Sequence, residues 1–307
     1  MAVDYGNLSP ELLDEFLQDH TTELAPLLSF QQWGDERPVT AREGKVYRYI
    51  SPLELPTDGH RSSGVAPGSA TPRRNVTFGT IDYNCELDYK IRRDIDENLR
   101  DQIETYDDIS NKLIKASTMD VVADYVRDNI VPILNGSGLA GDDRNFTQQS
   151  LSGNAWDDGT PGNPTTDIDA VVKALRGGDL ICVLGFDVAQ ALSRNPFVTG
   201  SDAGSGEEQV AFPEVIRYLQ QRGIREVYID ATVEQATEGH YARSYGGLYD
   251  GIFSVFTRGN VIVPRLQDLV QRVWYDDDRD CWAYKAKHVR DARRAYAEHG
   301  YYISALA

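Results

Sequence analysis

Apolar and polar residues alternate strictly over positions 81–91, Ile-Asp-Tyr-Asn-Cys-Glu-Leu-Asp-Tyr-Lys-Ile. Successive side chains of a strand point to opposite faces, so this period predicts one half-buried strand. A second limb at residues 45–50 precedes it, and together they predict a long hairpin over residues 43–92. The stretch between the limbs, residues 56–74, is rich in Gly, Pro and Ser and cannot form a core of its own.

A helical period follows over residues 107–134. Asp107 and Asp108 would cap the start of this helix, and Pro132 would bend or end it near its last turn. At about 1.5 Å per residue the helix would run roughly 40 Å, which is long for a globular protein. Its apolar positions recur at spacings of three, four and seven and would share one face: Ile109, Leu113, Ala116, Ala123, Val126, Ile130 and Leu134.

Shorter elements surround these two. A Ser-Pro-Glu start and a stripe of Leu and Phe predict an arm helix within residues 8–33. Beyond residue 165 the two periods alternate, which indicates a compact α/β block with helices at 167–175, 187–193 and 212–221 and strands at 180–184 and 227–231. The chain then returns to strands at 270–275 and 281–286, around an Asp-rich turn, and closes on a strand at 300–305.

Charge narrows the functional classes. The 307 residues carry a net charge of −17, which repels phosphate backbones and disfavours specific nucleic-acid binding. Only seven of the 31 basic residues are lysine; this fits either a protein kept hydrated in concentrated salt or a host with a GC-rich genome. No secretory signal or membrane-spanning stretch is present. The three cysteines, Cys85, Cys182 and Cys281, are too few for a disulfide framework, and no pair has metal-ligand spacing. We therefore expect synthesis and assembly in a cytoplasm.

Motifs for catalysis or cofactor binding are weak. Gly136, Gly138 and Gly141 have the spacing of the glycine motif in dinucleotide-binding folds. They follow a predicted helix and precede two aspartates, so a loop that ends the helix is expected instead. The aspartates of residues 276–280 indicate a solvated turn or an occasional cation site. The five histidines lack ligand spacing and no nucleophile motif occurs, so no catalytic, cofactor or metal residue is predicted. A pair of carboxylates acting as acid and base stays open.

Four segments carry a resemblance to a known family. They are residues 76–99, which contain the alternating strand; residues 151–158, Leu-Ser-Gly-Asn-Ala-Trp-Asp-Asp; residues 180–196, an apolar strand leading into a helix; and the closing Gly-Tyr-Tyr-Ile-Ser-Ala. In this order and spacing the chain resembles, over about residues 40–307, the major capsid proteins of tailed double-stranded DNA viruses. Their Hong Kong phage shell fold is shared with the encapsulin nanocompartments.

The resemblance implies an α+β shell fold in five parts. These would be an N-terminal arm (1–42), an extended loop hairpin (43–92), a peripheral domain with a long spine helix (93–164), an axial α/β domain (165–262) and a return to the peripheral domain (263–307). It implies no enzymatic activity. The subunits would assemble in the host cytoplasm as hexamers and pentamers into the icosahedral shell of a virion, enclosing DNA without reading its sequence.

Partners follow from the same resemblance. Copies of the chain would contact each other through loop residues His60, Arg61, Arg73 and Arg74, because residues 57–75 carry a local charge of +2 on an acidic chain; the alternative is that these arginines only keep the loop soluble. Residues 56–74 contain no lysine, so the isopeptide cross-link of some family members is not expected. The segment before the hairpin is too short for a large fused scaffold, so a separate scaffolding protein, a portal and a cement or decoration protein are expected. The alternatives are an encapsulin-like shell around protein cargo and an acidic α/β enzyme of a halophile.

Overall fold

A computed structural model describes residues 30–48, 79–97, 109–137, 145–158, 161–176, 178–200, 209–230, 234–235, 245–246 and 249–306. The expected arm helix is described only at α3 (Phe30–Trp33). Most of residues 8–33 and the predicted caps Asp107 and Asp108 lie outside the described residues.

A long antiparallel ribbon of three strands forms one part of the molecule. Strand β12 (Cys281–Arg290) lies between β11 (Val261–Asp276) and β4 (Tyr89–Asp96). The short strands β1 (Asp35–Pro38) and β13 (Arg293–Arg294) pair with the opposite end of β11, β1 in parallel and β13 antiparallel. Asp276 faces Cys281 across a tight turn, which confirms the turn predicted at residues 276–280.

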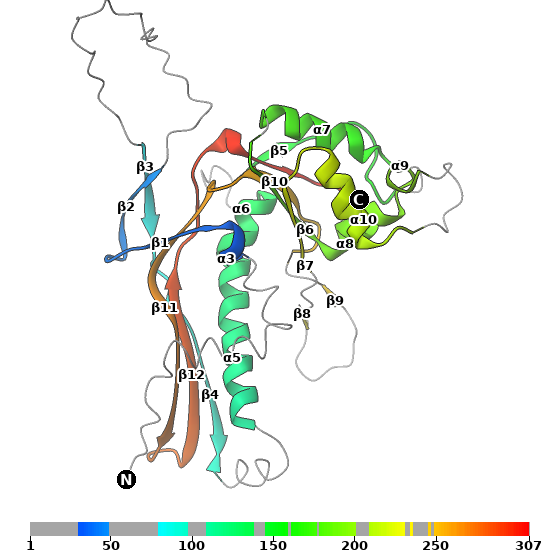
Figure 1. The fold of residues 1–307 in the computed structure, drawn as a ribbon. Helices are drawn as coiled ribbons and strands as arrows, with labels where there is room; N and C mark the ends of the chain where they lie inside the picture. Colours follow the sequence, from blue (N-terminus) through cyan, green and yellow to red (C-terminus); the bar gives the residue numbers. More distant parts are fainter. Residues whose placement is uncertain are drawn as a thin grey trace, which may run out of the picture.

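A helix of three parts lies along this ribbon (Figure 1). The α-helix α5 (Ile109–Tyr125) passes into a π-helical turn (Val126–Ile130) and then into α6 (Val131–Asn135). Pro132 was expected to bend or end the helix near its last turn; a π-helical turn precedes it, and the helix ends three residues after it, at Asn135. In a regular α-helix a proline ring clashes with the carbonyl four residues earlier. The wider π-helical turn just before Pro132 makes room for that ring. Gly136, in the left-handed region at φ 66°, ends the helix as predicted.

The buried face of the helix differs from the predicted stripe in its first half. Val126 and Ile130 are fully buried, whereas Ala123 is only partly buried. Leu113 is also only partly buried, and the side chains of Ile109 and Ala116 lie outside the described residues. The first half instead buries Ile114, Ser117, Thr118, Val121, Val122 and Tyr125. The two buried hydroxyls donate to carbonyls four residues back, which explains why an apolar period does not reveal this face.

The second part of the molecule is an α/β block. Its sheet has the order β5 (Thr147–Gln149), β14 (Gly300–Ile303), β10 (Phe253–Thr257), β6 (Leu180–Gly185) and β7 (Glu226–Asp230). Helices α7 (Pro164–Ala174), α8 (Phe186–Arg194), α9 (Pro196–Thr199) and α10 (Phe212–Gln221) belong to this block. Two short strands, β8 (Glu234–Gln235) and β9 (Tyr245–Gly246), pair with each other. A 3-10 turn (Ala297–His299) precedes β14.

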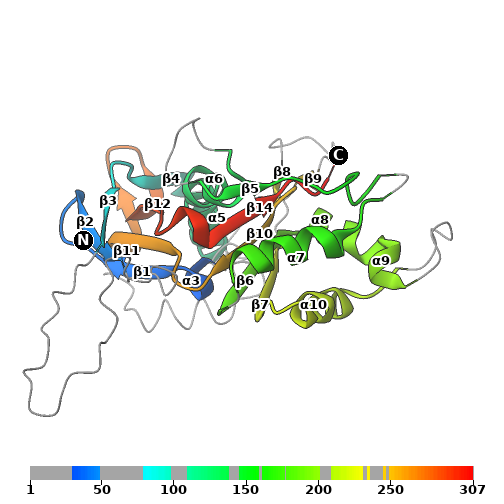
Figure 2. The same cartoon turned by 90° about the horizontal axis from the view of Figure 1, so that it is seen from above.

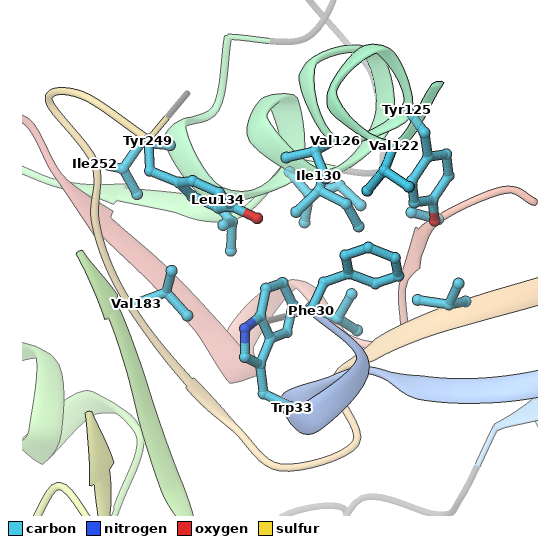
Figure 3. Close-up of a cluster of buried hydrophobic side chains, with 14 of the residues drawn as sticks. Phe30, Trp33, Val122, Tyr125, Val126, Ile130, Leu134, Val183, Tyr249 and Ile252 are labelled. Atoms are coloured by element: carbon cyan, nitrogen blue, oxygen red, sulfur yellow. The ribbon is translucent and has the colours of Figure 1, made fainter. Parts of the chain in front are cut away.

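Strand β6 divides the hydrophobic core in two. Every residue of β6 is buried, because both faces of the strand are covered. Cys182 and Leu184 face the cluster formed with α7, α8 and α10. Ile181 and Val183 face the other cluster, which contains the end of the spine helix and α3. Figure 3 shows Phe30 and Trp33 of α3 among the side chains of that second cluster.

Two predictions about strands are wrong. The alternating run 81–91 is two strands, β3 (Gly79–Asn84) and β4, because the chain changes partners at residues 85–88. Leu87, which continues the apolar period, is therefore 59% exposed. The closing strand β14 was assigned to the peripheral segment, but it pairs with β10 inside the α/β sheet.

Candidate functional site

The hairpin β2–β3 stands apart from both large sheets of the described chain. Strand β2 (Glu43–Arg48) pairs only with β3, in a two-stranded sheet separate from the other sheets. Figures 1 and 2 both place this pair at one end of the molecule, away from α9. The Tyr47 side chain is 66% exposed, and the Lys45–Asp82 ion pair (3.6 Å) is solvated. Isolated two-stranded hairpins are marginal in water, so this one needs further contacts.

A small core holds the base of the hairpin. Val46 and Tyr83 contribute from β2 and β3, and Cys85 follows at the point where the chain leaves the hairpin. They pack against Ile262, Val289, Ala295 and Tyr296 from the β11–β12 end of the ribbon. Burial raises the pKa of the Cys85 thiol to about 11, so this cysteine is a small apolar side chain rather than a nucleophile.

Asp291 joins the hairpin to the rest of the subunit. Its carboxylate is buried and accepts hydrogen bonds from the Asn84 backbone N–H (2.8 Å) and from Arg293 Nε (2.6 Å). Its backbone carbonyl accepts from the Tyr125 hydroxyl of the spine helix (3.0 Å), and its N–H donates to the Pro264 carbonyl of β11 (2.9 Å). One residue therefore fixes three elements. No periodic signal in the sequence points to Asp291.

Arg42 closes the break between β3 and β4. Its guanidinium donates to the carbonyl of Glu86 (3.1 Å) and to the Asp88 carboxylate (2.9 Å). Asp88 also pairs with Lys287 of β12 at 3.1 Å. The hydrogen bond from Lys287, together with that from Arg42, lowers the pKa of Asp88. The chain therefore leaves the hairpin along a fixed path into the ribbon.

The segment preceding the hairpin is anchored by a half-buried ion cluster. The guanidinium of Arg290, which is 6% exposed, pairs with Glu36 of β1 at 3.3 Å and lies 5.7 Å from the centre of the Phe30 ring. Arg265 pairs with the same Glu36 at 3.4 Å. The attractions hold α3 and β1 against the ribbon.

Polar contacts join the spine helix to the ribbon. Gln271 Nε2 donates to Thr118 Oγ1 (2.5 Å), and Arg93 pairs with Asp120. The imidazole of His288 is 1% exposed, lies against Tyr89 and Tyr125, and shares a hydrogen bond between Nε2 and the Val121 carbonyl (3.3 Å). Burial, assisted by the Arg290 charge, lowers the pKa of His288 to about 4. The joint is therefore assembled with a neutral histidine.

The predicted loop residues His60, Arg61, Arg73 and Arg74 all lie outside the described residues, so their contacts stay a prediction. Only the base of the predicted hairpin is described, and its antiparallel pairing from Glu43–Asn84 to Arg48–Gly79 follows the expected pattern.

Two carboxylates of the α/β block, the buried Asp167 and the partly buried Asp187, are engaged in structural hydrogen bonds. Asp167 accepts from the Ser152 N–H (2.8 Å) and from Trp156 Nε1 (2.9 Å). Asp187 accepts from the N–H groups of Val188 (2.7 Å) and Gly251 (2.6 Å), although burial raises its pKa. Within the described ranges no three potential ligand side chains form a metal-binding group. None of the helices in this part of the chain has the length and apolar character needed to cross a bilayer.

Comparison with known proteins identifies the fold. The sequence matches no protein-family profile and no curated protein. The structure is similar to a phage-related protein from Bordetella bronchiseptica, with 12% identity, coverage of 98% of this chain and 99% of that one, and a TM-score of 0.62. It is also similar to the capsid of a cyanophage (13% identity, 91% and 88% coverage, TM-score 0.57).

A third similar structure is a virus-like particle from Pyrococcus furiosus, with 11% identity, 94% and 98% coverage, and a TM-score of 0.51. All three comparisons cover most of both chains. The chain therefore has the α+β shell fold of tailed-virus capsids, as the sequence resemblance implied.

Proposed function

We propose that this chain is the major capsid protein of a tailed double-stranded DNA virus, a structural protein that assembles into an icosahedral shell. The β2–β3 hairpin carries the proposal, because it stands apart from both large sheets and exposes Tyr47. Its own subunit buries Val46 and Tyr83 at one side and leaves Tyr47 exposed, and such an exposed hairpin surface is stabilised by lying on another subunit. The shell fold indicates that this other subunit is a copy of the same chain, since one of the similar structures is a capsid.

The hairpin is firmly oriented at its base. Asp291, Arg42 and the core around Cys85 all act on the residues nearest the ribbon. A rigid base lets the outer part reach a neighbouring copy in one direction, which is a requirement for closed symmetric assembly. The loop residues His60, Arg61, Arg73 and Arg74 are then the proposed contacts with that copy, through bidentate pairing of arginine with carboxylates.

The first test replaces residues 56–74 by Gly-Gly. We expect a folded subunit that forms no closed shells, since the change leaves the base of the hairpin intact. Electron microscopy reports assembly, and urea unfolding of the unassembled subunit reports folding. Closed particles of normal size from the shortened chain would refute the role of the hairpin.

A second test addresses the charges of that loop. The triple change Arg61→Gln, Arg73→Gln, Arg74→Gln should reduce assembly at low salt, and the deficit should shrink as salt screens the pairs. The matched control is Lys173→Gln, Arg194→Gln, Arg217→Gln, which removes the same charge from helices of the α/β block. Superimposable assembly curves for the loop variant and wild type would exclude an electrostatic role.

An encapsulin-like shell is the second candidate, because a virus-like particle is among the similar structures. The content of the particles separates the two functions: packaged double-stranded DNA supports the capsid, and protein cargo with no genome supports the nanocompartment. Hexamers and pentamers, a separate scaffolding protein, a portal and a cement protein all belong to the capsid proposal. The enclosed DNA would be held without sequence-specific contacts.

A further inference from the structure

The ribbon has two chemically different faces. Gln271, Ala286 and Ile91 stand opposite one another in the three strands, and Gln271 contacts Thr118, so this row faces the spine helix. Side chains alternate along each strand, so the neighbouring rows face away from the helix. One of these rows is Arg272, Lys285 and Arg92, and the next is Val270, Lys287 and Lys90. We call these two rows, which hold five cations, the cationic face. The next rows on the same side, Trp274–Ala283–Asp94 and Asp276–Cys281–Asp96, carry three carboxylates toward the turn.

The row Arg272–Lys285–Arg92 places three positive charges directly opposite one another on adjacent strands. Like charges in such positions repel each other and destabilise the sheet. The arrangement is conspicuous in a chain of net charge −17 that has only seven lysines, of which three lie on this face. Asp94 and Asp276 offset the charge of Arg92 within the subunit, and an anionic partner would offset the repulsion between Arg272 and Lys285.

Two of the five cations already have partners within the subunit. Arg92 pairs with Asp94 (2.6 Å) and Asp276 (2.5 Å) and lies over the Trp274 ring, and Lys287 pairs with Asp88. Lys90, Arg272 and Lys285 have no ion pair with any residue of the described part of the chain. Val270 and Trp274, both partly exposed, lie on the same face. The cationic face therefore combines three cations that have no ion pair among the described residues with apolar area.

Residues 1–29 have the complementary chemistry. They contain six carboxylates and neither lysine nor arginine: Asp4, Glu11, Asp14, Glu15, Asp19 and Glu23. Leucine and phenylalanine residues are interspersed with them. The segment ends at Phe30, which is fixed against the ribbon's Arg290. At roughly 3.3 Å per residue, 29 extended residues reach far beyond the roughly 33 Å length of the ten-residue strand β12.

We infer that the cationic face binds the acidic N-terminal segment, residues 1–29, of a copy of this chain. The carboxylates offset the row of like charges, and the apolar side chains cover Val270 and Trp274. In an assembled shell this contact joins one subunit to the ribbon of the next, so the inference rests on the proposed function. The occupant that it excludes is packaged DNA, the other polyanion in a capsid.

Zero-length carbodiimide cross-linking tests the contact, because it joins a carboxylate to an amine only when the two touch. The full-length protein is treated both as unassembled subunits and as assembled particles, and cross-linked peptides are identified by mass spectrometry. We expect Lys90 and Lys285 to cross-link to carboxylates of residues 1–29 about tenfold more than Lys173 on α7 does. Mixed ¹⁴N and ¹⁵N subunits show whether the two residues come from different copies.

Paired variants test the energetics. The cationic-face variant is Lys90→Gln, Arg272→Gln, Lys285→Gln, and the segment variant is Glu11→Gln, Asp14→Asn, Glu15→Gln. Each should lower assembly at low salt by a similar factor, and their combination should be no worse than either alone. The triple change at Lys173, Arg194 and Arg217 serves again as the charge-matched control and should leave assembly near wild type.

The outcomes separate the two levels of the proposal. Closed shells whose lysines Lys90 and Lys285 cross-link elsewhere, or not at all, overturn this inference and leave the capsid function standing. Protection of both lysines from acetylation only in DNA-filled particles assigns the face to DNA and also overturns it. Cross-links to residues 1–29 in unassembled subunits support the contact even where no shell forms, a result that would count against the capsid function alone.

Discussion

His288 makes the joint between the spine helix and the ribbon sensitive to acid. Its imidazole is buried between Tyr89 and Tyr125, whose own pKa values are raised, so both neighbours stay neutral. The folded-state pKa of His288, about 4, lies below the ordinary value of 6.5. The unfolded chain therefore binds the proton more readily, and the stability present above pH 6.5 is lost as the pH falls toward 4.

The size of this loss follows from the two pKa values. It amounts to about 2 kcal/mol at pH 5 and about 3 kcal/mol near pH 4. The replacement His288→Gln removes the titration and keeps an amide that can donate to the Val121 carbonyl. Urea unfolding of unassembled subunits is measured for both proteins at pH 8 and pH 5. Carboxylates elsewhere affect both proteins equally, so only the difference between their pH responses reports on His288.

We expect wild type to lose about 2 kcal/mol more than His288→Gln between pH 8 and pH 5. The variant is itself less stable at pH 8, because an amide does not reproduce the ring packing, but that offset cancels in the comparison. Equal losses for the two proteins would mean that His288 is already solvated or charged in the folded subunit, and the reasoning from its burial would be wrong.

Three further changes test the fold, each by urea unfolding of the unassembled subunit. Val126→Asp should cost several kcal/mol because it buries an unpaired charge, whereas Leu113→Asp at a partly exposed position should cost less; equal effects would contradict the assigned helix face. Asp291→Ala should cost about 2–4 kcal/mol by stranding the Asn84 N–H and the buried end of Arg293. Gly136→Ala should destabilise by over 1 kcal/mol, since φ is 66° and the new methyl would meet the Tyr302 ring; unchanged stability would refute this.

Local patterns predicted elements whose period matches their burial, on both faces for β6 and on one face for α10. The apolar run of β6 is buried on both faces, and α10 occupies the predicted residues 212–221. Gly136 at the end of the spine helix was likewise predictable, because the left-handed backbone that ends a helix is required at a single residue, and glycine adopts it without strain. The pattern analysis did not predict β10, although Phe253–Phe256 are all buried. This run of four residues, interrupted by Ser254, is too short to choose between strand and helix by period alone.

Partner choice could not be read from the chain. Residues 81–91 alternate without interruption, yet the strand ends at Asn84 because β3 pairs with β2 while β4 pairs with β12. The closing strand lies beside β10 for the same kind of reason. In the spine helix, Ser117 and Thr118 can be buried because their hydroxyls donate to carbonyls within the helix. A search for periodic apolar residues does not find them, because both side chains are polar. A strand's period gives its faces, but not which strand will lie beside it.

The sequence by itself determined the order of elements, their resemblance to a shell fold, and the contrast between an acidic chain and its scarce lysines. The tertiary structure alone decided which distant residues act together. Asp291 links a hairpin residue 207 positions away, and Arg272, Lys285 and Arg92 become one row only through the register of three strands. The reason is physical: periodicity is a property of consecutive residues, whereas a hub or a charged face is created by pairing between segments that the chain brings together only on folding.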